Sequence, residues 1–75
     1  MYHMQTQIID VTLLQPYDWF YPVVQATGEV VKDDYMRQVI KRPRIDHNNG
    51  AIVVGTSIGT LNYQNGAKVA REVTA

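Results

Sequence analysis

Residues 51–73 read AIVVGTSIGTLNYQNGAKVAREV and carry the clearest local folding signal in the chain. The pair Asn65-Gly66 is the strongest two-residue hairpin signal, because a type I′ turn requires positive φ at both central positions. It separates a β-rich run over 51–63, interrupted by glycines, from a second run over Ala67–Val73. We therefore predict a hairpin with Asn65-Gly66 at its tip and Tyr63 paired with Lys68.

Composition extends this prediction to the whole chain. The sequence has ten Val, six Ile and six Thr against three Leu and five Ala. β-branched residues favour strands, whereas Leu and Ala are among the best helix formers. We expect a mainly β fold, a small antiparallel sheet or half-open barrel, in a single domain over residues 1–75.

Two further strands are expected in the first half of the chain. Alternation over Gln5–Leu14 predicts a strand whose core face carries Ile9, Val11 and Leu13. The run Val23–Val31 predicts a second strand, bent or bulged at Gly28.

The segment Asp33–Lys41 is compatible with either a helix or a strand. As a short helix, which we favour, it has acidic residues at its start and Lys41 at its end, matching the helix dipole. It then presents an apolar stripe of Met36, Val39 and Ile40. As a strand it would pair with Val23–Val31. Pro43 is expected to end either element. The fold class therefore stays mainly β, or α+β with this one helix near residues 33–41.

Size and composition limit the possible functions. A chain of 75 residues buries only about 60% of its unfolded surface. Such a small domain usually needs extra stabilisation from disulfides, a bound metal or self-association. The chain has no cysteine, so it cannot form a disulfide. His3 and His47 lie far apart in the sequence, so we expect no metal site. Self-association remains, so we expect a homodimer or larger homo-oligomer. Zero net charge, no long apolar run and no visible signal peptide suggest a cytoplasmic protein without a membrane partner.

The most unusual stretch is Pro16-Tyr17-Asp18-Trp19-Phe20-Tyr21-Pro22. Four of the seven aromatic residues of the chain fall within it, between two prolines. Proline lacks a backbone donor, so we do not expect this stretch to form a central strand. Trp19 and Phe20 are candidates for the core as well as for an interface, and Tyr17 and Tyr21 for the surface. Aromatic residues dominate binding hot spots, which makes the stretch the main candidate site.

A second candidate site is the basic stretch Tyr35, Arg37, Lys41, Arg42 and Arg44. Cations beside an aromatic ring suit a phosphate backbone. The nearby carboxylates of Glu29, Asp33 and Asp34 offer the competing interpretation, a solvated face with local ion pairs.

Catalytic motifs are weak. Residues 55–59 match G-x-S-x-G, but a nucleophile elbow needs a strand, a turn and a helix in a much larger domain. Asp46-His47 resembles an oriented base, yet Asp46-His47-Asn48-Asn49-Gly50 has the composition of an exposed loop. We therefore expect neither enzymatic activity nor a cofactor.

These observations favour a non-enzymatic homo-oligomer that binds and modulates a macromolecular partner, expected to be a protein. Its partner-binding residues would be Tyr17, Trp19, Tyr21, Arg42 and Arg44. One alternative is a nucleic-acid-binding module that uses the basic stretch. The other is a binder of a small anionic ligand, such as a nucleotide, between subunits. Small, charge-balanced β-rich chains are common among accessory proteins of phages and mobile elements, an association that rests on no motif.

Overall fold

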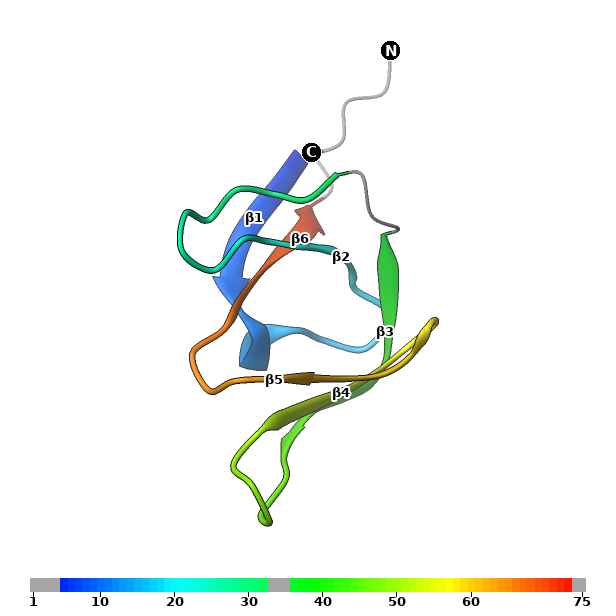
Figure 1. The fold of residues 1–75 in the computed structure, drawn as a ribbon. Helices are drawn as coiled ribbons and strands as arrows, with labels where there is room; N and C mark the ends of the chain where they lie inside the picture. The colour runs from blue at the N-terminus through cyan, green and yellow to red at the C-terminus, as the bar shows by residue number, and fades with distance from the viewer. Residues whose placement is uncertain (1–4, 33–35, 74–75) are drawn as a thin grey trace.

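The computed structural model describes residues 5–32 and 36–73. In this part of the chain, six strands form one antiparallel sheet with the order β1-β6-β2-β3-β4-β5 (Figure 1). The elements are β1 (Gln5–Asp10), the 3-10 helix η1 (Val11–Leu13), β2 (Trp19–Pro22), β3 (Arg37–Ile45), β4 (Ile52–Thr56), β5 (Gly59–Tyr63) and β6 (Lys68–Val73). The predicted mainly β fold is confirmed, and the sheet does not close into a barrel. The described residues contain no helix long and apolar enough to cross a membrane.

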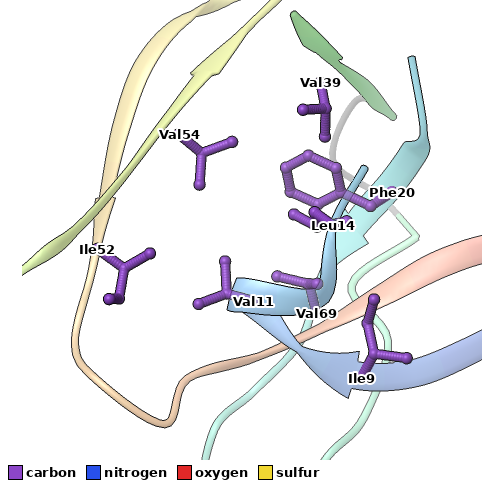
Figure 2. Close-up of a cluster of buried hydrophobic side chains, with 8 residues drawn as sticks. All are labelled: Ile9, Val11, Leu14, Phe20, Val39, Ile52, Val54 and Val69. Atoms are coloured by element: carbon purple, nitrogen blue, oxygen red, sulfur yellow. The ribbon is translucent and has the colours of Figure 1, made fainter. Parts of the chain in front are cut away.

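The sheet folds around one core. β2 to β5 follow one another as a meander, and β6 then returns to lie between β1 and β2. In Figure 1, β1, β6 and β2 lie on one side, β4 and β5 on the other, and β3 connects them. Eight buried side chains fill the space between these layers: Ile9, Val11, Leu14, Phe20, Val39, Ile52, Val54 and Val69 (Figure 2). We call the opposite, solvent-facing side of the sheet its outer face.

The predicted first strand is shorter than expected. The Asp10 carboxylate accepts hydrogen bonds from the Thr12 backbone N–H (2.9 Å) and hydroxyl (2.7 Å), and the chain turns into η1. This turn breaks the alternation of the strand, because a 3-10 helix has three residues per turn. Leu14 is therefore buried at 2% exposure while Leu13 is 56% exposed. The predicted core face is right for Ile9 and Val11 and wrong for Leu13.

The strand expected over Val23–Val31 is wrong. This segment is a tight loop, closed by a single bridge between Val23 and Val30. The Gly28 N–H donates to the Val24 carbonyl (2.7 Å), with φ of +76° at Gly28. The glycine therefore closes a turn, where we expected a bend within a strand.

The helix favoured near 33–41 is also wrong for the described residues of that span. Residues 37–41 begin β3, which pairs with β2 and β4, and residues 33–35 lie outside the described part. β3 does not end at Pro43, because its pairing with β4 shifts register between Lys41 and Arg44. Proline is tolerated at such an irregularity, where its missing N–H costs no regular ladder bond.

The C-terminal hairpin is only partly as predicted. Residues 51–63 form two strands, β4 and β5, and not one interrupted strand. The Ala67 N–H donates to the Gln64 carbonyl (3.1 Å), which confirms a turn at Asn65-Gly66. Of the two central residues of this turn, Gly66 has positive φ (+87°) and Asn65 does not, so the turn is not type I′. Beyond it, β6 pairs with β1 and β2 instead of β5, and the predicted pairing of Tyr63 with Lys68 does not form.

The aromatic stretch does contain a central strand, contrary to expectation, because β2 lies between β6 and β3. Its last residue, Pro22, needs no donor, since the pairing of β2 with β3 ends at Phe20. The Pro22 carbonyl accepts from the Val31 N–H (2.9 Å). The predicted loop at 46–50 is confirmed. It joins β3 to β4, with the Gly50 N–H donating to the Asp46 carbonyl (2.7 Å).

Candidate interaction surface

The turn before β2 displays Tyr17. The Asp18 N–H donates to the Gln15 carbonyl (3.1 Å), so Gln15–Asp18 is a β-turn with Pro16 and Tyr17 at its centre. Tyr17 has φ of +72° and is the only described non-glycine residue with positive φ. A type II turn requires this conformation at its third position, where glycine is normally found. Tyr17 is nevertheless 72% exposed, so packing of its ring does not explain the strain.

Hydrogen bonds from outside the turn hold it in this conformation. The Tyr17 N–H donates to the Val39 carbonyl (2.7 Å), and the Gln38 amide donates to the Tyr17 carbonyl (3.3 Å). The Asp18 carboxylate accepts from the Gln15 N–H (2.8 Å) and lies 3.8 Å from the Arg71 guanidinium. Strained residues persist where the surroundings determine them in this way, and they concentrate at functional sites. The turn therefore holds the Tyr17 backbone in place and directs its side chain into solvent.

Gln38 connects this turn to other exposed apolar side chains. It lies on β3 between the buried Arg37 and Val39, so its side chain belongs to the outer face. Its register partner on β2 is Trp19, which is exposed. The Gln38 N–H donates to the Ser57 hydroxyl (3.1 Å), which brings the β4–β5 turn and its exposed Ile58 alongside.

Ile40, also exposed, lies two residues further along β3, within a shift of register against β4. We call the group Tyr17, Trp19, Ile40 and Ile58 the Gln38 surface. Sequence reasoning identified Tyr17 and Trp19. It missed Ile40 and Ile58, because three separate elements meet at Gln38 only in the folded chain.

The cations of the basic stretch fall into two environments. Lys41, Arg42 and Arg44 are exposed on β3, beyond the Gln38 surface. Among the described residues, none of the three has a carboxylate within ion-pair distance; the ion pairs there are Lys68–Asp10 (3.7 Å) and Arg71–Asp18 (3.8 Å). The expected local pairing with Glu29 is therefore absent, and Asp33, Asp34 and Tyr35 lie outside the described part.

Arg37 is separated from the other cations. It is 7% exposed, and its guanidinium lies 6.0 Å from the centroid of the Phe20 ring. That position suits a cation–π contact within the core rather than contact with a ligand on the outer face. Tyr21 is half-buried and in register with the buried Ala70 of β6. Of the predicted partner-binding residues, Tyr17 and Trp19 adjoin Gln38, and Arg42 and Arg44 follow along β3. Tyr21 lies two residues beyond Trp19 on the same face of β2, beside β6.

Tyr63 supplies a pH-dependent contribution to stability. Burial raises the pKa of its hydroxyl, and the nearby Arg37 guanidinium acts in the opposite direction. A raised pKa in the folded state means that neutral Tyr63 favours folding. This contribution is complete below the unfolded pKa of about 10 and is lost as pH rises through the folded value.

Between about pH 9 and pH 11, the free energy of unfolding should fall less for Tyr63→Phe than for the natural chain, because the variant has no phenol to ionise at this position. Urea unfolding at both pH values measures this, with Tyr17→Phe on the exposed turn as control. The same pH dependence in the natural chain and Tyr63→Phe would contradict the assignment.

The motifs considered for catalysis both lie at turns between strands. Residues 55–59 form the end of β4, a two-residue turn and the start of β5, not the strand–turn–helix of a nucleophile elbow. Asp46 and His47 line an open hollow of about 440 Å³ at the β3–β4 loop. The Asp46 carboxylate accepts from the Asn48 N–H (2.9 Å), a bond typical of such turns. Within residues 5–32 and 36–73, no group of His, Asp and Glu side chains could hold a metal ion.

The Gln38 surface, together with the exposed Lys41, Arg42 and Arg44 of β3, thus forms the best candidate site among the described residues, and it offers apolar and cationic contacts to a binding partner. Comparison with known proteins neither adds to this assignment nor alters it: no family model, curated protein or solved structure matches the chain.

Proposed function

We propose that this protein is a non-enzymatic binding protein that docks a macromolecular partner through the Gln38 surface. The observation that carries the proposal is Tyr17, an exposed aromatic side chain in a strained backbone conformation that the fold holds in place. The conformation of the turn does not call for a tyrosine, because glycine would adopt it without strain. Recognition by a partner supplies a reason for the ring.

The composition of the surface supports this function. Tyrosine and tryptophan supply large contact areas and are enriched in binding hot spots. The backbone that carries the ring is already held by hydrogen bonds, so it loses little conformational entropy on binding, which favours affinity. The exposed Lys41, Arg42 and Arg44 follow this apolar group along β3, without ion pairs among the described residues, and would guide an acidic partner surface toward it.

Tyr17→Gly separates folding from binding. We expect it to raise the free energy of unfolding by up to about 1 kcal/mol, since glycine adopts positive φ without the steric penalty of an L-residue. Loss of the ring should weaken partner binding by at least about tenfold, as for a hot-spot residue. Thermal unfolding measures the first effect.

Affinity capture from the source cell, read by mass spectrometry, identifies the partner, and titration of the purified partner measures binding. Leu13→Ala removes an exposed apolar side chain from η1 and is the matched control. A captured partner whose affinity is the same for Tyr17→Gly and the natural chain would contradict the proposed function.

The double substitution Arg42→Ala, Arg44→Ala tests the cations in the same titration. We expect the fold to be retained, because both side chains are exposed, and partner affinity to fall. A nucleic-acid partner would be recognised by the salt dependence of its affinity. Binding would weaken steeply as salt is added, and each lost cation would lower the slope by about one unit. Full affinity in the folded double variant would restrict the site to Tyr17, Trp19, Ile40 and Ile58.

A further inference from the structure

β1 is an edge strand of the sheet. Among the described residues it pairs with β6 on one side only. The Val11 N–H, directly after β1, donates to the Ala67 carbonyl on the β6 side (2.9 Å). Backbone groups of successive strand residues point to opposite sides. The N–H and C=O groups of Thr6, Ile8 and Asp10 therefore point away from β6.

Lys68 gives an independent check of this direction. It is the register partner of Asp10 on β6. The Lys68 N–H donates to the Gln25 side-chain oxygen (2.8 Å), and the Lys68 carbonyl accepts from the Gln25 amide (3.0 Å). Gln25 follows β2, on the side of β6 away from β1, so the backbone groups of Lys68 are directed away from Asp10. Asp10 consequently directs its own backbone groups to the open edge.

This edge lacks the features that usually prevent strands from pairing between molecules. Such edges carry lysine, proline, a bulge or an inward charge. β1 has none of these, and its single charged residue, Asp10, already lies 3.7 Å from the Lys68 ammonium. At its centre, Ile8 is 45% exposed. The opposite edge strand, β5, differs: it exposes the polar Thr60 and Asn62, and its Leu61 and Tyr63 pack against the core.

We propose that a second copy of this chain pairs with β1 in antiparallel orientation, with the two-fold axis at Ile8. In this register Ile8 lies opposite Ile8 of the partner subunit, and Thr6 lies opposite the partner subunit's Asp10. Every outward-pointing N–H and C=O of Thr6, Ile8 and Asp10 then finds a partner. An axis at Gln7 would pair Thr6 with the partner's Ile8, so the two exposed Ile8 side chains would no longer lie opposite each other.

The side chains agree with the same axis. Ile8, Ala70 and Tyr21 form one cross-strand row on the outer face. Pairing at Ile8 continues this row into the second subunit and removes the exposed isoleucine from water. The Thr6 hydroxyl meets the partner's Asp10 carboxylate, a suitable hydrogen-bond acceptor. Zero net charge leaves no long-range repulsion between the copies.

Cysteine cross-linking tests this arrangement directly, because the natural chain contains no cysteine. Ile8→Cys places two cysteines across the axis at a Cα separation of about 5.5 Å, within the range that a disulfide spans. We expect mild oxidation to convert Ile8→Cys to a covalent dimer. Leu13→Cys on η1, a position more exposed than Ile8, should remain monomeric under the same conditions. A yield for Ile8→Cys no greater than for Leu13→Cys would overturn the proposal.

Two further measurements fix the register and the surface. Gln7→Cys should cross-link less than Ile8→Cys, and the reverse order would move the axis to Gln7 and overturn the proposed register. Ile8→Lys places like charges opposite each other and should raise the dimer dissociation constant by at least about tenfold in sedimentation equilibrium. Circular dichroism verifies that this variant is folded. A natural chain that sediments as an 8.5 kDa species across the micromolar range, or a dimer unaffected by Ile8→Lys, would refute pairing through β1.

Discussion

Phe20→Ala is expected to unfold most of the protein at room temperature. Phe20 is fully buried within the apolar cluster (Figure 2). Its neighbours in register are Arg71 on β6 and Arg37 on β3. Removing a buried phenylalanine costs about 3–5 kcal/mol, through lost burial and the cavity left behind. A single core in a chain of this size rarely supplies more than about 3–5 kcal/mol in total. The substitution also removes the ring beneath the Arg37 guanidinium.

Circular dichroism in a urea series measures this loss. Phe20→Leu keeps most of the volume and should cost less than about 1.5 kcal/mol, so it remains folded. Trp19→Ala, one residue earlier, removes a larger but exposed ring and should change the free energy of unfolding by less than about 1 kcal/mol. If Trp19→Ala destabilised as much as Phe20→Ala, the assignment of inward and outward faces on β2 would be wrong.

At the Asn65-Gly66 turn, opposite effects are expected from two neighbouring substitutions. Gly66 has φ of +87°, and a β-branched residue there is strained even though no atom lies close enough to clash. We expect Gly66→Val to lower the free energy of unfolding by about 1–2 kcal/mol. Asn65 has no positive φ and occupies the second position of the turn, where a type II turn favours proline.

Asn65→Pro should therefore preserve stability or raise it by up to about 1 kcal/mol, because proline restricts the unfolded chain. A type I′ turn would give the contrary result, since proline cannot adopt positive φ. The two melting temperatures, measured on otherwise identical chains, distinguish the turn types. A large loss of stability in Asn65→Pro would instead indicate the type I′ turn that the sequence suggests.

Local patterns were most informative where a signal depends on a few neighbouring residues. The β-branched composition correctly indicates strands, and clusters of Asn, Asp and Gly correctly mark the turns at 46–50 and at Asn65-Gly66. Ile9 and Val11 are buried as the alternation predicts. The error at Leu13 arises because the Asp10 side chain starts a turn, a hydrogen bond that periodicity alone does not represent.

The candidate site was predictable only in part, for the same reason. Exposed aromatic residues and cations are visible as residue types, which identified Tyr17, Trp19, Arg42 and Arg44. Arg37 has the same residue type but is buried, with its guanidinium over the Phe20 ring. Ile40 and Ile58 carry no local signal at all. They belong to the surface because β2, β3 and the β4–β5 turn meet at Gln38.

The sequence by itself determined that the chain forms strands and where two of its tightest turns occur, because backbone preference and turn chemistry act over a few residues. Only the tertiary structure decided which strands pair. The Asn65-Gly66 turn would permit β6 to pair with β5, yet β6 lies between β1 and β2, where Val69 and Ala70 are fully buried. Burial of such side chains contributes more free energy than the preference of one turn, about 1 kcal/mol, can oppose. Pairing therefore follows the apolar surface that the whole chain can bury together.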